Sequence, residues 1–234
     1  MVNITDGSML AEKLQAGLVE LGLDLAVRQQ KQLLDYVAMI AKWNKVYNLT
    51  AIRDEGEMLT HHLLDSLAVI SPLQKHLDGL HANASKTHRL LDVGAGAGLP
   101  GVVVAICCPE ISVSCVDAVG KKGAFIQQAA LALALPNLRG IHARVEQMLP
   151  ADVRGGFDVI TSRAFATLSD FVGLTTDLLL PNTGVWMAMK AKTADAESAG
   201  LPKDVAVFHV EQLHVPSLDG DRCLVWVRPR AICA

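Results

Sequence analysis

Charged residues and cysteines are scarce in this chain. Of its 234 residues, 19% are charged and 51% are hydrophobic, and the formal net charge is −3. So little charge argues against a disordered chain. It also argues against a stand-alone nucleic-acid-binding protein that works through bulk positive charge. A local basic face, or a nucleic acid that other proteins already cover, is not excluded.

The five cysteines indicate neither a metal site nor a disulfide framework. Their number is odd, they form no Cys-x-x-Cys pair, and Cys107 and Cys108 are adjacent, a spacing that rarely closes one tetrahedral metal site. We therefore expect reduced, buried thiols in a cytoplasmic protein.

The sequence predicts no targeting or membrane-spanning segment. Residues 1–13 lack the basic segment and apolar run of a secretory signal. The uncharged stretch 93–108 contains four glycines and Pro100. It is short for a membrane span and favours a buried turn followed by a helix.

The first third of the chain is predicted to be helical. Within 33–43 and within 58–70, apolar residues recur at three- and four-residue steps, which is typical of one helix face. The polar segment 44–57 separates these two helices, and residues 76–88 are expected to be a linker. The residues that form the apolar faces are Leu33, Val37, Ile40, Ala41, Leu59, Leu63, Leu67 and Ile70.

From Arg89 onward, short apolar runs alternate with helical patterns. Such alternation implies an α/β fold with a parallel sheet covered on both faces. The last two strands leave no room for a helix between them and should be antiparallel. Strands are expected at 90–93, 111–117, 140–143, 157–161, 184–189, 205–213 and 223–228, and helices at 121–135 and 167–180.

A glycine-rich turn, Asp92-Val93-Gly94-Ala95-Gly96-Ala97-Gly98-Leu99, follows the first expected strand. In doubly wound sheets the ligand lies beyond the carboxyl ends of the strands, at the first strand-to-helix turn. Pro100 suits the start of the next helix, where a missing N–H costs nothing. The turn therefore predicts a ligand site, although a structural turn without a ligand would have the same residues.

Two cofactors fit this turn. Gly96-x-Gly98-x-x-Gly101 formally matches the dinucleotide fingerprint. However, the strand ends before Gly94, and the carboxylate of Asp92 is poorly placed beside phosphates. It is well placed beside the ammonium group of S-adenosylmethionine, directly or through water. Asp117, at the end of the second strand, would bind ribose hydroxyls with either cofactor.

Five motifs in sequence order resemble one known family. They are Lys42-Trp43-Asn44-Lys45-Val46-Tyr47-Asn48-Leu49-Thr50, His62-x-x-Asp65-Ser66, Asp92-Val93-Gly94-x-Gly96-x-Gly98-Leu99-Pro100-Gly101, Ser162-Arg163-Ala164-Phe165-Ala166 and Pro216-x-Leu218-Asp219-Gly220-x-Arg222. This order is similar to that of the bacterial 16S rRNA guanine-N7 methyltransferases, the RsmG or glucose-inhibited division protein B (GidB) family. The match runs from about Gln30 to Val227, and the first thirty residues match little.

The resemblance implies a Rossmann-like S-adenosylmethionine-dependent methyltransferase fold. It has a mostly parallel seven-stranded sheet with an antiparallel last strand. An N-terminal helical extension, 1–85, precedes the methyltransferase core, 86–234. The implied activity is methyl transfer to N7 of guanosine 527 in 16S rRNA, within the 30S subunit or an assembly intermediate. A monomer that needs no metal and no membrane is expected.

The resemblance also implies cofactor contacts by Gly94, Leu99, Val145, Glu146 and Arg163. Glu146 could accept a hydrogen bond from the adenine amino group, while Val145 offers an apolar wall to the ring. Arg163 could position the cofactor's carboxylate or bind an RNA phosphate. As structural alternatives, Glu146 is a solvated helix start and Arg163 a surface ion-pair partner.

Two positions depart from the family's usual residues. His61 stands where arginine is frequent, and Cys223 stands where histidine is common. Each change weakens a potential RNA contact.

Guanine N7 carries a lone pair and no proton, so the implied reaction requires no general base. No side chain is therefore expected to act as a catalytic acid or base. After the fourth strand the chain reads Thr161-Ser162-Arg163, with no Asn-Pro-Pro-aromatic motif for amino-group methylation and no cysteine nucleophile. His62 and Asp65, three residues apart on a helix, could interact locally.

Several cations are candidate RNA contacts, although each could equally be a plain solvated side chain. They are Lys42, Lys45, Arg53, Lys190, Lys192 and Arg222. The motif 42–50 could also serve to dock the extension onto the core. Three alternatives to the implied function stay open: a nicotinamide-dependent oxidoreductase, a non-catalytic RNA-binding module, and a methyltransferase with another acceptor.

Overall fold

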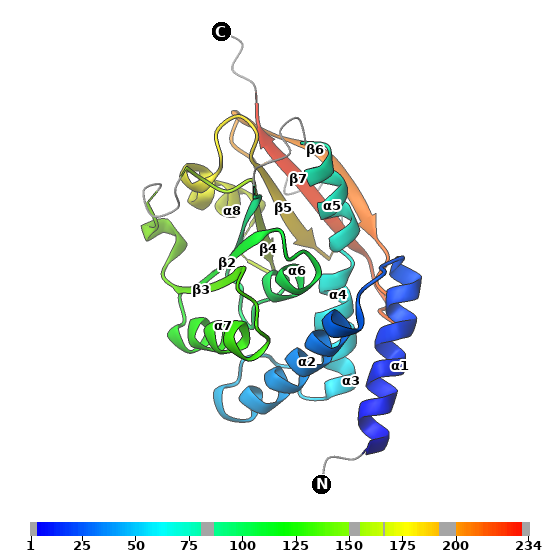
Figure 1. Cartoon of the computed structure of the whole chain (residues 1–234). Coiled ribbons are helices and arrows are strands. Elements are labelled where there is room, and N and C mark those ends of the chain that lie inside the picture. Colours follow the sequence, from blue (N-terminus) through cyan, green and yellow to red (C-terminus); the bar gives the residue numbers. More distant parts are fainter. Residues whose placement is uncertain (1–3, 81–86, 150–154, 166, 192–199, 231–234) are drawn as a thin grey trace.

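Seven β-strands form one mixed sheet in the part of the chain that the structure describes (Figure 1). The structure is a computed structural model, and it describes residues 4–80, 87–149, 155–165, 167–191 and 200–230. The order across the sheet is β3-β2-β1-β4-β5-β7-β6. The strands are β1 (Arg89–Val93), β2 (Ser112–Asp117), β3 (Leu138–His142), β4 (Val159–Arg163), β5 (Val185–Lys190), β6 (Val205–Leu213) and β7 (Arg222–Pro229).

Strands β1 to β5 pair in parallel, and β7 pairs antiparallel with both β5 and β6. The prediction of a mostly parallel sheet with an antiparallel last strand is confirmed. Parallel strands covered on both faces read as continuous apolar runs. Strand β5 illustrates this, because its residues from Val185 to Met189 are all buried.

Helices cover both faces of the sheet (Figure 1). In β1, Leu90 packs into one apolar cluster, while its neighbours Leu91 and Val93 pack into the other, as alternating side chains in a strand require. The first cluster includes side chains from α1 (Ile4–Leu21), α2 (Val27–Tyr47), α5 (Ile70–Asp78), α6 (Gly101–Cys107) and α7 (Gly120–Ala132). The second includes side chains from α8 (Leu168–Thr175) and the 3₁₀ turns η2 (Val145–Gln147) and η4 (Thr176–Leu178).

The predicted helices exist, but several boundaries differ. The segment 33–43 is the middle of the longer α2, and the helix predicted at 167–180 ends at Thr175 before a 3₁₀ turn. The predicted linker 76–88 is wrong at its start, because residues 76–78 are the last turn of α5. None of the described helices is both long and apolar enough to cross a membrane.

The helix predicted at 58–70 is not one regular α-helix. It consists of α3 (Glu55–Met58), a π-helical segment η1 (Leu59–Leu64) and α4 (Asp65–Leu67). The backbone N–H of Asp65 donates to the carbonyls of Thr60 and His62. π-Helical turns are rare and occur frequently at functional sites.

Helix α2 ties the extension to the core through side chains that meet backbone carbonyls. The Gln29 amide accepts from the backbone N–H of Ala26 at 3.0 Å and donates to the carbonyl of Ile106 at 2.8 Å. It thereby satisfies a carbonyl in the last turn of α6, which has no partner within its own helix. The buried Tyr36 hydroxyl donates to the carbonyl of Ala97 in the glycine turn.

Tyr36→Phe should therefore destabilise the protein without changing its fold. Removing the hydroxyl leaves the Ala97 carbonyl without its buried donor, which costs about 1–3 kcal/mol of unfolding free energy. Urea unfolding monitored by circular dichroism measures the change. The matched control is Tyr47→Phe, because the Tyr47 side chain is 42% exposed. Equal unfolding midpoints for Tyr36→Phe and the wild type would contradict this role.

Candidate functional site

Two cavities lie where the parallel strands end. The first, of about 500 Å³, is called the extension cavity because the helical extension forms one wall. The second, of about 470 Å³, is called the Glu146 cavity. Gly94 and Ala164 line both, so the cavities meet at the glycine turn. Each has the size of a small-molecule site, and each lies at the carboxyl edge of the sheet, where such folds bind ligands.

The glycine turn has a backbone that only glycine adopts readily. Gly94, Gly96 and Gly98 have φ angles of 64°, 61° and 88°. A Cβ atom added to Gly94 would lie 2.6 Å from Cδ2 of Phe165, and one on Gly98 would lie 2.5 Å from Val102. The predicted turn is therefore closely packed on two sides, against Val102 of α6 and against Phe165, which follows β4.

Asp117 anchors the turn from the end of β2. Its Oδ2 accepts from the backbone N–H of Gly96 at 2.9 Å, and its Oδ1 accepts from Val119 at 2.9 Å. The Lys122 ammonium lies 3.5 Å from Oδ2. Asp117 and Lys122 both line the Glu146 cavity. The structure thus holds this predicted ribose-binding carboxylate rigidly at the cavity wall.

Asp92 lies beneath the turn and lines neither cavity. It is fully buried, and its Oδ2 accepts from the backbone N–H of Gly101 at 2.8 Å, at the start of α6. Burial raises the pKa of its carboxyl to about 7. Asp92 is therefore placed to support the turn, and its predicted contact with a methionine ammonium group stays a prediction.

Val145 and Glu146 lie side by side in η2 and line the Glu146 cavity. Val145 is buried, whereas Glu146 is exposed and pairs with Arg144 at 3.2 Å. A hydrogen bond from its own backbone N–H lowers the pKa of Glu146. The pair combines an apolar surface with an ionised acceptor. Leu99 lies apart from them, buried at the wall of the extension cavity.

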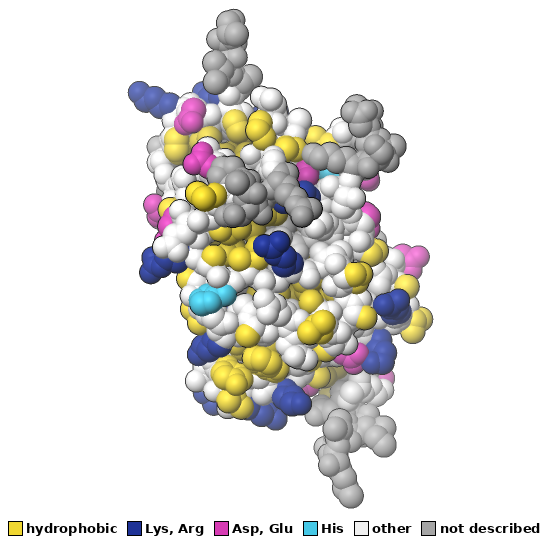
Figure 2. Space-filling model, turned by 60° about the vertical axis from the view of Figure 1, so that its left-hand side comes forward, with side chains coloured by type: hydrophobic (Ala, Val, Ile, Leu, Met, Phe, Trp, Pro, Cys, Tyr) yellow, Lys and Arg dark blue, Asp and Glu magenta, His cyan; other side chains and the backbone are white. Residues whose placement is uncertain are grey.

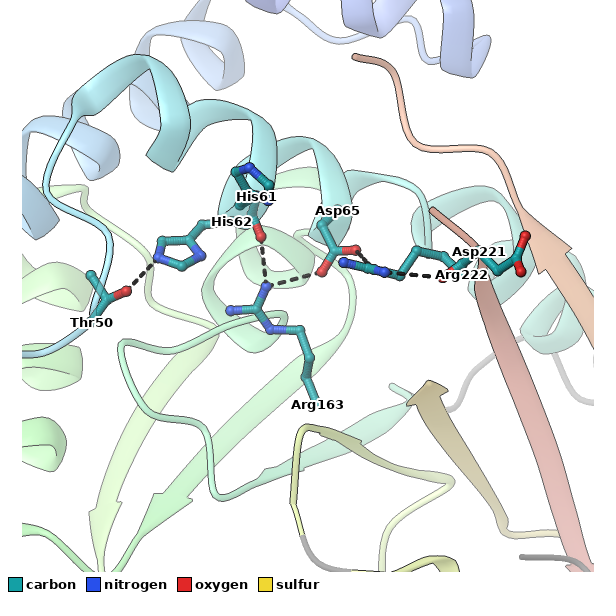
Figure 3. A network of polar contacts seen from close by, with 7 residues as sticks. All are labelled: Thr50, His61, His62, Asp65, Arg163, Asp221 and Arg222. Atoms are coloured by element: carbon teal, nitrogen blue, oxygen red, sulfur yellow. Dashed lines mark hydrogen bonds and ion pairs between the residues drawn. The ribbon is translucent and has the colours of Figure 1, made fainter. Parts of the chain in front are cut away.

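Arg163, at the end of β4, points toward the extension (Figure 3). Its Nη1 donates to the carbonyl of His61 at 3.0 Å and to Oδ2 of Asp65 at 3.0 Å. Nε of Arg222, at the start of β7, donates to Oδ1 of the same Asp65 at 3.1 Å. One buried carboxylate therefore holds two guanidinium groups from different strands. The sequence alone does not predict this bridge.

His62 and Asp65 form their hydrogen bonds with other residues. Nε2 of His62 lies 2.7 Å from Oγ1 of Thr50, and Asp65 pairs with the arginines (Figure 3). Burial, with Arg163 nearby, lowers the pKa of His62 to about 4. Asn44 fixes the loop that brings Thr50 here, because its side chain accepts from Thr50 N–H at 2.9 Å. These contacts lie within the extension. Trp43 of the same motif contacts the core, because its ring packs edge-on against Phe125 of α7 with centroids 5.3 Å apart.

The candidate RNA contacts fall into two groups. Arg222 and Lys190 line the extension cavity, whereas Lys42, Lys45 and Arg53 are exposed outside both cavities. Lys192 lies outside the described residues. Figure 2 shows one face, on which Lys and Arg side chains are scattered among apolar ones and form no continuous stripe. Of the candidate RNA contacts, the two that line a cavity, Lys190 and Arg222, both lie at strand ends.

Cys107, Cys108 and Cys115 are free and buried, as predicted, Cys223 is buried as well, and Cys233 lies outside the described residues. Burial raises the pKa of the Cys108 thiol to about 12. A search of the described residues finds no group of three or more His, Cys, Asp or Glu side chains that could hold a metal ion.

The amino-acid sequence is similar to that of one known protein family. The sequence model for "rRNA small subunit methyltransferase G" (GidB) matches residues 29–225. The ribosomal RNA small subunit methyltransferase G of Polaromonas sp. (strain JS666) is 58% identical over 225 residues, covering 95% of both chains. That of Paracidovorax citrulli is 57% identical over 226 residues, covering 94% of this chain and 90% of its own.

A solved structure shares the fold. It is a SAM-dependent methyltransferase of Leishmania major, with a TM-score of 0.56 and 16% identity, covering 82% of this chain and 83% of that one. At this identity the likeness concerns the fold alone.

The raised pKa of Asp92 predicts a pH-dependent stability. The folded state keeps a proton that the unfolded chain releases above about pH 4. This contribution to stability is therefore present at low pH and is lost as the pH rises toward about 7. Asp92→Asn should remove that decline, which amounts to about 4 kcal/mol at most for a shift of about three units.

Urea unfolding at pH 5 and pH 8 measures the effect, with Asp177→Asn as the control because Asp177 is exposed. If the two variants lost the same stability between these pH values, the buried proton on Asp92 would be refuted.

Proposed function

Because the chain belongs to the rRNA small subunit methyltransferase G family, we propose that it methylates N7 of guanosine 527 in 16S rRNA, using S-adenosylmethionine. The observation that carries this proposal is the family match over residues 29–225, together with relatives that are more than half identical over nearly the whole chain. The same five motifs that supported the resemblance fall within or beside the matched region.

The residues around the two cavities fit the cofactor. The apolar side chain of Val145 and the carboxylate of Glu146 suit an adenine ring and its amino group, and Asp117 suits the ribose hydroxyls. Gly94 would let a ligand approach the backbone closely, at the point where the cavities meet. When bound, S-adenosylmethionine supplies an electrophilic methyl group on a sulfonium. The protein's own task is to hold and orient both partners.

The charges around the extension cavity favour an anionic acceptor. Three of its lining residues are cationic, namely Arg163, Lys190 and Arg222, and Asp65 is the single carboxylate among them. Over the described lining residues, the formal charges therefore sum to +2. A bound S-adenosylmethionine carries a further positive charge on its sulfonium. An acceptor that brings phosphates, as RNA does, would compensate this excess.

Two titratable residues of the cavity lining, Asp65 and His62, are poor general bases. Asp65 is paired with two guanidinium groups, and the low pKa of about 4 makes His62 a weak proton acceptor. Guanine N7 needs no base, because it attacks with a lone pair and loses no proton. Rate enhancement would then come from in-line positioning and from stabilising the guanine as it becomes cationic.

The proposal includes the setting of the reaction. Guanine in folded RNA is read mainly in unpaired loops, through stacking and edge contacts. The slight net negative charge supports a substrate that is an assembled or partly assembled 30S subunit, where ribosomal proteins add docking surface. We propose a cytoplasmic monomer. Lys42, Lys45 and Arg53, exposed beyond the cavities, would contact RNA outside the target nucleotide.

The proposal predicts that deleting the gene removes one N7-methylguanosine from 16S rRNA. Borohydride reduction and aniline treatment cleave RNA at that base, and primer extension then maps the stop. The stop at guanosine 527 should disappear in the deletion strain and return with a plasmid copy of the wild-type gene. A stop that persists without the gene would contradict the proposed target.

Gly94→Asp should abolish binding of S-adenosylhomocysteine. A side chain there would need a positive φ and would lie against Phe165, and its carboxylate would enter the junction of the cavities. Isothermal titration calorimetry measures the affinity, which should fall by at least about 100-fold, the equivalent of roughly 3 kcal/mol.

Gly7→Asp is the control, because nothing lies within 4 Å of a Cβ at Gly7. A folded Gly94→Asp protein with wild-type affinity would place the cofactor elsewhere.

A further inference from the structure

Asp65 is a buried carboxylate with two cationic partners. Its side chain is 5% exposed, while those of Arg163 and Arg222 are 22% and 27% exposed. All three line the extension cavity. The carboxylate is thus inside the wall, and the two guanidinium groups reach the cavity surface. Breaking a buried pair by removing one partner is costly, so Asp65 constrains both arginines strongly.

The hydrogen bonds of Arg163 use only one of its nitrogens. A guanidinium has five N–H donors, and the bonds to His61 and Asp65 both start from Nη1. Within the described residues, Nε and Nη2 of Arg163 have no hydrogen-bond partner. In Figure 3 Nη2 is turned away from Asp65, toward the side where Thr50 and His62 lie. Both of those residues also line the cavity.

The π-helical turn contributes to this arrangement. In an α-helix the N–H of Asp65 would donate to the carbonyl of His61, but here it donates to the carbonyls of Thr60 and His62. The carbonyl of His61 instead accepts from Arg163. The guanidinium is therefore held at two points of the extension, the His61 carbonyl and the Asp65 carboxylate.

We propose that Asp65 is a positioning residue that aims the free Nε–Nη2 edge of Arg163 into the extension cavity as a binding fork for an oxyanion. Two parallel N–H donors on one planar group match a carboxylate or a phosphate. Arg222 is a second cation in the lining of the same cavity. Its Nη2 has no hydrogen-bond partner within the described residues. This inference rests on the proposed function, which supplies both candidate oxyanions.

The oxyanion has two potential sources with the same chemistry. One is the carboxylate in the methionine part of the cofactor, and the other is a phosphate of the rRNA beside the target guanosine. In either case the fork is useful only if its direction is fixed, since a freely rotating arginine loses conformational entropy on binding. Asp65 removes that cost in advance.

Asp65→Asn tests the proposal, because asparagine preserves the shape but removes the charge. The first arm is calorimetric titration with S-adenosylhomocysteine, which keeps the carboxylate. The second arm is KM for 30S subunits from a strain that lacks the methyl mark. The variant should weaken one arm by about 10-fold or more, as expected for losing an aligned charged hydrogen bond. Loss in the first arm identifies the cofactor carboxylate, and loss only in the second identifies an RNA phosphate.

Arg163→Lys is the second variant, and it keeps a cation beside Asp65 while removing the planar fork. It should weaken the same arm as Asp65→Asn, and it tests the proposal even if Asp65→Asn does not fold. The control is Asp35→Asn, because Asp35 pairs with Lys31 on the exposed side of α2 and lines neither cavity.

The proposal is overturned if Arg163→Lys leaves both arms within about twofold of wild type, or if the two variants weaken different arms. It is also overturned if Asp65→Asn lowers only the melting temperature and leaves both arms unchanged. The calorimetric arm needs no RNA. Wild-type protein that binds S-adenosylhomocysteine but never methylates 30S subunits would therefore refute the proposed function without deciding the role of Asp65.

Discussion

The carboxylate of Asp65 joins three parts of the chain that meet at one cavity. It lies on the helical extension, and its two oxygens bind Arg163 from the end of β4 and Arg222 from the start of β7. The two arginines offset the cost of burying this charge. Because the same carboxylate orients both guanidinium groups, the extension forms part of the site as well as covering one face of the sheet.

The glycine turn is held in a similar way, from several directions. Asp117 binds its N–H at Gly96, Asp92 fixes the start of the following helix, and Tyr36 binds the carbonyl of Ala97. None of these contacts requires a ligand to be present. The backbone that faces the cavities is therefore preorganised, which lowers the entropy lost on binding.

The sequence predicts much of the fold, because strands buried on both faces and helices with one apolar face leave clear patterns. The family resemblance implies that Gly94, Val145 and Glu146 contact one cofactor, and all three line the Glu146 cavity together with Asp117. The sequence could not predict the π-helical turn, because the apolar residues from Leu59 to Ile70 recur at steps of four and three, which also fit a regular α-helix. The partners of Asp65 lie 98 and 157 residues away in sequence, so only its place in a motif marked it.

The central claim is that one ligand site spans both cavities, with the glycine turn at its middle. A crystal structure of the protein with S-adenosylhomocysteine tests this most directly. The account predicts the adenine beside Val145 and Glu146, the ribose at Asp117, and the amino-acid end of the ligand in the extension cavity. Adenine density in the extension cavity, or a ligand that does not touch Gly94, would contradict it.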